Sequence, residues 1–370
     1  MPDFLDRLGD VLETRREELA STLRLEAAAG EGALERLVRE HWSALPATVP
    51  APVSGETEWA AYAVDGSLSE VGLDNGSHLI LVQALALGED GFERASLDVQ
   101  VLPATTPRST AARVADLLQQ RHEFSLAVEI VTEHAQPGSV LFLDGALYGR
   151  LPQLYSLSLE EAGPLANLPD QVLSLYLRLL HTAAERDVFL VAVAKTSHEA
   201  THAKLWLDAA GATARLPEDA TDSGLIHRFT DRTAGLSDPV LLGGRGFTGG
   251  SRDILARPEV SASPAIVSFF VRLADFDDAL RIDVPCRQCG AQATLGDLEA
   301  EVLSGGAAAA HATVRLLQAD YGGLEVYNAL LYSVDREVRL KRDTVRQVYL
   351  PMIEQSLGLP VRRNRSERRF

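Results

Sequence analysis

The order of hydrophobic patterns between residues 59 and 194 constrains the fold of this 370-residue chain more than any other feature. The first part reads as three strands joined by short polar turns, at 59–64, 79–87 and 95–102. Short turns between consecutive strands are typical of an antiparallel meander. Residues 109–135 then change to a helical period, with apolar side chains three and four positions apart.

Two short segments after this helix are apolar at nearly every position, at 140–143 and 188–194, and a second helical pattern at 165–185 separates them. Strands of this kind are buried on both faces, as in a sheet covered by helices on either side. The sequence therefore predicts a mixed α/β sheet with flanking helices. Weaker patterns continue it with helices at 200–209, 295–303 and from 324 onward, and with strands at 265–273 and 280–284.

Helical patterns at both ends and a breaker segment rich in proline divide the chain into four parts. Residues 1–45 are expected to form an N-terminal helical extension, since Phe4, Leu8 and Val11 belong to an apolar stripe of helical period. Residues 46–58 read as a linker. The main domain then covers 59–335, and a basic helix and tail form 336–370.

Charge is distributed unevenly along the chain, which has 35 Lys and Arg against 52 Asp and Glu and a net charge of −17. This balance excludes a protein whose whole surface coats nucleic acid, because phosphate affinity comes from basic groups. Residues 336–370 nevertheless carry ten basic and four acidic residues, a charge of +6. That end is expected either to contact a polyanion or to be a solvated helix.

Three absences indicate where the protein works. No apolar run approaches the roughly 20 residues that a bilayer span needs, and the first residues carry acids where a signal peptide would carry bases. Two cysteines, Cys286 and Cys289, cannot cross-link a chain of this size. We expect a cytoplasmic protein.

Carboxylates follow two of the predicted strands in one local pattern, an apolar run that ends in Asp-Gly: Asp65 in AYAVDGS and Asp144 in VLFLDGA. The helix between them carries Glu123, Glu129 and Glu133, any of which could lean toward both aspartates. Converging carboxylates repel one another unless a divalent cation neutralises them. The pattern predicts a Mg²⁺ or Mn²⁺ site suited to two-metal phosphodiester hydrolysis, although each Asp-Gly alone could be a strand-ending turn.

Three motifs carry a resemblance to a known family: AVDGS at 63–67, FLDGAL at 142–147 and VAVAKTS at 191–197. Their order and spacing resemble the central signatures of the NurA nucleases. The resemblance implies a core similar to ribonuclease H and to the PIWI domain of Argonaute. It also implies a homodimer that works with a hexameric HerA-type translocase and processes DNA ends in recombinational repair.

The resemblance assigns roles to residues of this chain. Asp65, Asp144 and Glu129 would hold the cations, with Glu123 and Glu133 as alternatives to Glu129. Lys195 would contact the scissile phosphate, where its charge could stabilise the transition state.

A late segment of the family contains a tyrosine and then a histidine, and DYGGLEVYNALL with Tyr321 resembles it. No histidine follows, because Ala329 occupies the expected position. Asn328, or else Asp320, could supply the missing metal contact. The departure also motivates a second hypothesis, a non-catalytic adaptor that docks to the translocase without cutting DNA.

The segment SHEATH offers a third hypothesis, because His198 and His202 satisfy the H-E-x-x-H pattern of zinc proteases. Lysines stand at both flanks, and a third ligand would have to be Glu218 or Asp222. We interpret both histidines as exposed helix residues.

Two other motifs lack the context that their chemistry requires. Gly244, Gly246 and Gly249 match a dinucleotide fingerprint by letter, but Pro258 would end any following helix, so we expect a loop in which Arg245 and Arg252 could touch DNA. Cys286 and Cys289 form a single C-x-x-C, half of a zinc site, and are expected to be free thiols in a turn. The chain has no phosphate-binding P-loop, so an ATP-driven step would need a partner.

Overall fold

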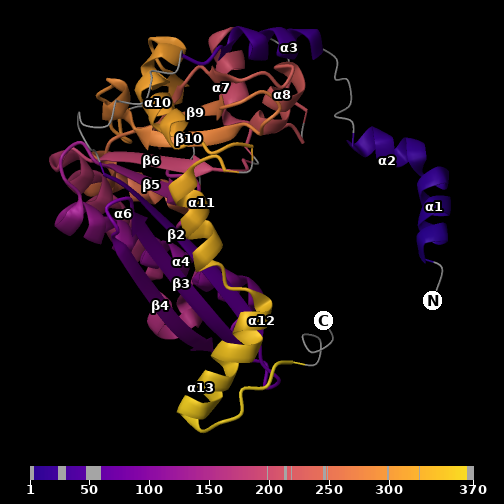
Figure 1. Cartoon of the computed structure of the whole chain (residues 1–370), viewed down its shortest axis with the longest axis vertical. Coiled ribbons are helices and arrows are strands. Elements are labelled where there is room, and N and C mark those ends of the chain that lie inside the picture. The colour runs from indigo at the N-terminus through magenta and orange to yellow at the C-terminus, as the bar shows by residue number, and fades with distance from the viewer. Residues whose placement is uncertain are drawn as a thin grey trace.

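The computed structural model describes residues 4–23, 31–46 and 60–364, except 198, 212–214, 218, 245, 246, 248, 298, 299 and 325. The predicted linker therefore lies almost wholly outside the described residues, as do the last six residues of the chain. Figure 1 shows an elongated body built around one sheet. No described helix is long and apolar enough to cross a membrane.

The first half of the sheet confirms the predicted order. A meander of three long antiparallel strands comes first: β2 (Ala61–Gly72), β3 (His78–Gly88) and β4 (Glu93–Leu102). Two short strands continue the sheet in parallel: β5 (Val140–Asp144) pairs with β2, and β6 (Phe189–Ala194) pairs with β5. The two kinds of pairing meet at β2, which makes the sheet mixed.

The second half of the sheet extends it beyond β6. In spatial order it adds β10 (Leu280–Pro285), β9 (Ile266–Arg272), β7 (Gly235–Ser237) and β1 (Trp42–Ser43), all antiparallel. Two short strands, β8 (Val240–Leu242) and β11 (Ala300–Val302), pair with each other, and β8 also pairs with β9. All residues of β9 and β10 are buried, as expected for strands covered on both faces.

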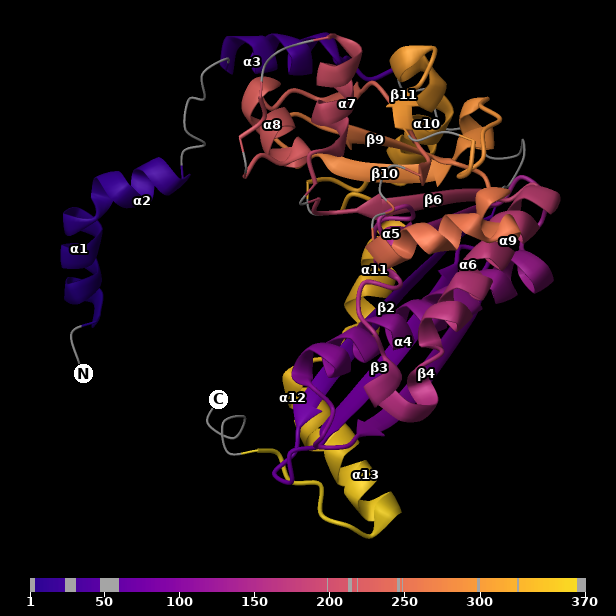
Figure 2. The same cartoon turned by 180° about the vertical axis from the view of Figure 1, so that it is seen from behind.

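Helices cover both faces of the sheet (Figure 2). One hydrophobic cluster joins the sheet to α4 (Arg108–Glu129), which continues into the π-helix η1 (Ile130–His134), and to α6 (Leu168–Glu185). A second cluster on the other face includes α10 (His311–Ala319) and α11 (Ala329–Val338). Sheet and helices together confirm the predicted fold class.

The N-terminal residues are helical as expected, in three separate helices: α1 (Phe4–Thr14), α2 (Arg16–Leu23) and α3 (Glu31–Glu40). The apolar side chains of α1 are exposed, Phe4 at 70% and Leu8 at 51%. By contrast, α3 packs into a third cluster with α7 (Thr201–Ala209) and α8 (Asp222–Phe229). Part of the predicted extension thus packs against the main body.

The C-terminal helices run along the meander. After α11 come α12 (Arg342–Thr344), the π-helix η7 (Val345–Tyr349) and α13 (Leu350–Leu357). Val345 and Leu350 pack on β2 and β3 through Val71, Leu79 and Leu81. The expected boundary between residues 335 and 336 falls inside α11.

One expected helix is absent from the described residues, and one strand faces solvent with its apolar side chains. The helix predicted at 295–303 is instead a turn followed by β11, because pairing with β8 takes precedence over local helical propensity. In β4 the apolar side chains of Leu97 and Val101 are 51% and 54% exposed, whereas Asp98 on the opposite face bonds to Arg121 of α4.

Candidate active site

Strand register places two aspartates at the same edge of the sheet. The parallel pairing of β2 and β5 ends at Val64 and Leu143, so Asp65 and Asp144 follow side by side. Asp65 is 6% exposed, and 17% of the Asp144 side chain is exposed. Both carboxylates therefore stand on rigid strands in a partly dry environment.

The glycines after these aspartates have different roles. Gly145 has a φ of +92°, the left-handed conformation that lets the chain turn sharply after β5. Gly66 makes no turn, contrary to expectation, because β2 continues to Gly72. A Cβ at Gly66 would lie 2.6 Å from Oε1 of Glu123, so this glycine allows α4 to approach the strand closely.

A third aspartate reaches the pair from α11. Carboxylate oxygens of Asp65, Asp144 and Asp335 all lie within 4.8 Å of one another. Lys195, directly after β6, donates to Asp144 Oδ2 at 2.8 Å, and its Nζ lies 3.6 Å from Asp335 Oδ1. Burial lowers the pKa of Lys195, but the attraction of Asp144 outweighs it and raises the pKa above its usual value. The lysine is thus held as a cation against the three aspartates.

Excess negative charge remains in this cluster. Burial, then the charges of Asp144 and Glu123, raise the pKa of Asp65 to about 7. The backbone N–H of Gly66 and the charge of Lys195 offset only part of this effect. Asp65 would ionise fully near neutral pH only with more positive charge beside it.

The helical acid nearest to Asp65 is Glu123, which is 3% exposed. Its Oε2 accepts a hydrogen bond of 2.6 Å from Arg150, and its Oε1 accepts one of 2.7 Å from Gln119. Arg150 also donates to the carbonyl of Asp144 at 2.8 Å. Glu123 therefore belongs to the surroundings of the aspartates, with Arg150 between it and the end of β5.

Glu129, which the resemblance selected, is not brought to the aspartates. Six residues rotate an α-helix by about 240°, so Glu129 leaves α4 in another direction from Glu123. Its carboxylate pairs with Arg94 at 2.8 Å and lies near Glu133 and His134. The structure thus separates the open alternatives: Glu123 lies at the site, and Glu129 and Glu133 lie outside it.

The late polar residues are also placed differently from expectation. The Tyr321 hydroxyl donates to Asp277 at 2.9 Å. Asn328 is buried as the N-cap of α11, where it accepts from the N–H of Leu331 at 2.8 Å and donates to Asp320 at 3.1 Å. None of these contacts reaches Asp65 or Asp144.

Tyr327 is the tyrosine beside the aspartates. Its ring lies 5.4 Å from Nζ of Lys195. Burial and the charge of Asp144 raise its pKa above the usual range, so it stays neutral. Sequence reasoning missed Tyr327 and Asp335, although Asp335 shares a helix face with buried Leu331 and Val338, a place unusual for a charged residue.

Comparison with known proteins identifies the family of this chain. The NurA domain family matches residues 60–340, most of the chain. The chain belongs to the NurA family. No curated protein matches it.

Solved NurA structures have the same fold as this chain. The NurA nuclease from Sulfolobus solfataricus is 16% identical, with a TM-score of 0.59 over 97% of this chain and 98% of that one. A NurA structure bound to dAMP and manganese is 12% identical, with a TM-score of 0.55 over 96% of this chain and 98% of that one. The resemblance stated from the three motifs is confirmed.

Oxygen donors in this aspartate cluster fit a hard divalent cation. Asp65, Asp144 and Asp335 offer carboxylates close enough to share one ion, and Mg²⁺ and Mn²⁺ prefer such ligands. The raised pKa of Asp65 shows that the charge of Lys195 does not balance the cluster. These residues could hold the metal.

The zinc-protease pattern does not form a site among the described residues. His198 and Glu218 lie outside them, and α7 begins only at Thr201. His202 is buried, contrary to expectation: Nδ1 lies 3.2 Å from Asp222 and Nε2 lies 3.1 Å from the carbonyl of Ser268. Both ring nitrogens are occupied within the protein.

The remaining motifs are local structure. Cys286 and Cys289 are free thiols in a 3₁₀ turn, and burial raises the pKa of Cys289 to about 12. The glycine-rich segment leads into a 3₁₀ helix, Gly249–Ala256, rather than the α-helix of a dinucleotide site. Arg245 lies outside the described residues, and Arg252 lies in that 3₁₀ helix.

Proposed function

We propose that this chain is a metal-dependent deoxyribonuclease that hydrolyses phosphodiester bonds. The observation that carries the proposal is the convergence of Asp65, Asp144 and Asp335 within 4.8 Å, with Lys195 bonded to one of them. The fold shared with a NurA structure bound to dAMP and manganese supports it.

The three aspartates would hold Mn²⁺ or Mg²⁺, and Glu123 would act as the helical carboxylate in place of Glu129. Two bound cations would supply an activated water and stabilise charge on the phosphate. Tyr321 and Asn328 have structural contacts of their own, so Asp335 takes the place of the fourth contact assigned to Asn328.

Lys195 and Arg150 prepare the site for an anionic substrate. Both are bonded to the acidic cluster, Lys195 through Asp144 and Arg150 through Glu123. Cations that bind the carboxylates compete with these two bonds, so Lys195 becomes available to the scissile phosphate. Its ammonium would then stabilise negative charge in the transition state.

The biological setting is part of the proposal. We infer from family membership a homodimer that works in the cytoplasm with a HerA-type hexameric translocase on DNA ends in recombinational repair. A chain of net charge −17 suits an enzyme that receives DNA from a motor. Co-elution with the cognate translocase and sedimentation of the isolated chain test the two assemblies.

Cleavage of end-labelled linear DNA tests the central proposal. Mn²⁺ is expected to support cleavage by the wild type, EDTA to abolish it, and Asp65→Ala and Asp144→Ala to reduce it by at least about 10³-fold. Glu129→Gln is the matched control, because this acid belongs to a separate carboxylate group and keeps cleavage within about twofold.

The same assay separates the adaptor hypothesis from the nuclease. An adaptor would leave DNA intact under every metal condition and would still stimulate the translocase after Asp65→Ala. Absence of cleavage with the translocase present, and with DNA binding demonstrated, would refute the nuclease.

A further inference from the structure

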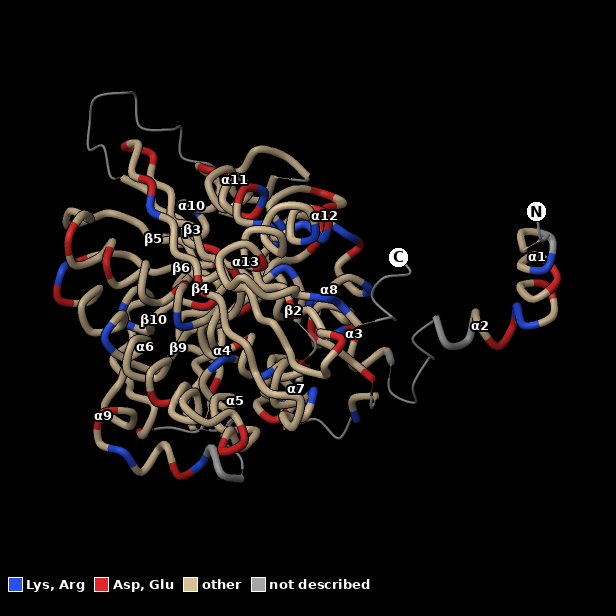
Figure 3. Tube along the Cα trace, turned by 90° about the horizontal axis from the view of Figure 1, so that it is seen from below, with Lys and Arg blue, Asp and Glu red and all other residues tan. Residues whose placement is uncertain are grey.

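Four arginines gather around a cavity at the far end of β2 from Asp65. The cavity has a volume of about 470 Å³. Arg108 belongs to the start of α4, Arg342 and Arg346 to α12 and η7, and Arg363 to the segment after α13. Figure 3 shows basic positions beside α12 at this end of the molecule. This concentration of basic side chains contrasts with the net charge of −17 of the chain.

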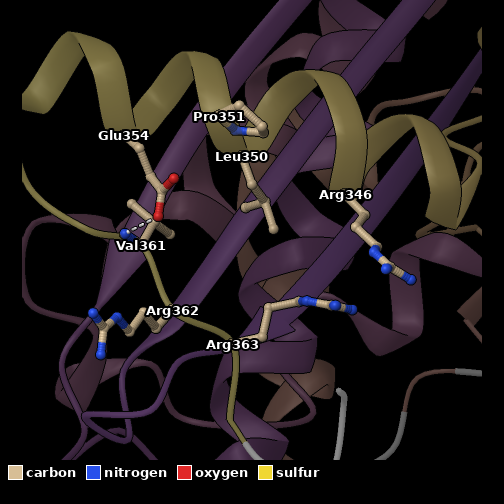
Figure 4. A pocket seen from close by; sticks show the side chains of 7 residues that line it. All are labelled: Arg346, Leu350, Pro351, Glu354, Val361, Arg362 and Arg363. Carbon is tan, nitrogen blue, oxygen red and sulfur yellow. Dashed lines mark hydrogen bonds between the residues drawn. The ribbon is translucent and has the colours of Figure 1, made fainter. Parts of the chain in front are cut away.

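Backbone pairing holds the last of these segments in place. Asn364 N–H donates to the carbonyl of Gly72 at 2.8 Å, and Asp74 N–H donates to the carbonyl of Arg362 at 2.8 Å. Glu354 accepts from the N–H of Val361 at 2.7 Å and ties the segment to α13 (Figure 4). The segment is thus built onto the end of the meander.

The side chains of two of these arginines extend to the same side. Figure 4 shows an adjoining pocket that shares Arg346 and Arg363 with this cavity; the guanidinium of Arg346 extends to the same side as that of Arg363, whereas Arg362 points to the other side. Arg108, Arg342 and Arg346 are exposed, and within the described ranges none forms an ion pair with an acid.

Acidic residues of the cavity do not cancel this charge. Glu70 and Asp343 also line it, but Glu70 accepts a hydrogen bond of 2.8 Å from His78. Arg108, Arg342 and Arg346 alone, which form no ion pair among the described residues, therefore outnumber the two carboxylates. The surplus positive charge fits an anion that several guanidinium groups bind at once, which is how arginine binds phosphate.

The cavity and the aspartate cluster lie toward opposite ends of the same strand, β2. β5 pairs with β2 only through Val64, and no described strand covers that edge of β2 from Asp65 until the segment at Arg363 pairs near Gly72. Ser69 and Gly72, both at the cavity, lie about 13 and 23 Å from Asp65 at 3.3 Å per residue. Phosphates of one DNA strand are about 3.4 Å apart along the axis, so the interval corresponds to four to seven nucleotides.

We propose that this arginine pocket binds backbone phosphates of the DNA whose scissile bond lies at Asp65 and Asp144. The inference rests on the proposed nuclease function for the identity of the ligand. The pocket contributes affinity without sequence preference, because contacts to phosphate carry no base information. It also fixes how far from Asp65 and Asp144 the DNA strand is held.

Equilibrium binding at several salt concentrations tests the pocket without cleavage. A fluorescein-labelled duplex and the corresponding single strand are titrated with the full chain in EDTA. Arg108→Ala with Arg346→Ala is expected to reduce the slope of log K against log salt by about 1.8 for the duplex, since each lost phosphate contact removes about 0.9. When salt is raised from about 50 to about 200 mM, the wild type would then lose about tenfold more of its duplex affinity than the variant loses.

Two matched variants complete the design. Arg178→Ala with Arg186→Ala removes two exposed arginines of α6 and its end, outside the pocket, and leaves the slope unchanged. Lysine at 108 and 346 keeps the charge and retains the slope. An unchanged slope in the alanine pair, or an equal loss in the α6 pair, overturns the proposal, whatever else the pocket binds. A wild type that binds DNA through these arginines but never cleaves it would refute the nuclease and leave the pocket standing.

Discussion

Replacing Asp65 by asparagine should stabilise the metal-free protein at alkaline pH. Asparagine keeps the oxygen that accepts from the N–H of Gly66 but cannot ionise beside Asp144 and Asp335. The difference between the ordinary aspartate pKa of 3.8 and the value of about 7 at Asp65 corresponds to about 4 kcal/mol of unfolding free energy.

The sign of the pH dependence follows from proton binding. Because the folded state holds the proton of Asp65 more tightly than the unfolded state, this residue makes wild-type stability fall as pH rises from about 4 to about 7. The stability of Asp65→Asn does not fall in this way. The free energy of unfolding of the variant therefore exceeds that of the wild type by an amount that grows from near zero at about pH 4 to a few kcal/mol at about pH 8.

Urea denaturation in EDTA across this pH range measures the effect. Mn²⁺ should raise the stability of the wild type at alkaline pH much more than that of Asp65→Asn, because the cation relieves the same repulsion. A variant that gains nothing at about pH 8, or that gains equally at every pH, would refute the reasoning.

Three further substitutions test particular contacts. Glu123→Gln should reduce cleavage at least tenfold and Glu129→Gln less than twofold, and equal losses in a DNA cleavage assay would argue against the assignment of Glu123. Gly66→Ala should displace Glu123 and reduce cleavage without unfolding the protein, since its Cβ would stand 2.6 Å from Oε1; full activity with unchanged Mn²⁺ affinity would contradict this. His202→Ala should lower the unfolding free energy by about 3 kcal/mol, because it removes the imidazole that bonds to buried Asp222, and should leave the zinc content unchanged. Loss of one zinc per chain in this variant would instead support the protease hypothesis.

Much of the fold was predictable because buried elements have characteristic patterns of apolar residues in the sequence. Strands β5 and β6 are apolar at nearly every position, and polar turns separate the strands of the meander. The order of these strands along the chain can therefore be predicted from the sequence. The prediction of a helix at 295–303 was wrong because β11, a strand of three residues, depends on its partner β8 for stability.

The site was only partly predictable for a different reason. Asp65 and Asp144 follow from the strand pattern, but three glutamates share one helix, and only the packing of α4 over Gly66 selects Glu123. Asp335 was missed because it lies near the other two aspartates only through the packing of α11 on β2, and no local sequence pattern predicts that packing. A charged residue on the same helix face as Leu331 was the available signal.

Mn²⁺ binding and DNA cleavage measured on the same preparations test the account most directly. Calorimetric titration should give metal binding to the wild type that is lost in Asp144→Ala and retained in Glu129→Gln, with cleavage rising over the same Mn²⁺ range. Metal binding that survives Asp144→Ala, or cleavage that persists without it, would contradict the assignment of the centre to Asp65, Asp144 and Asp335.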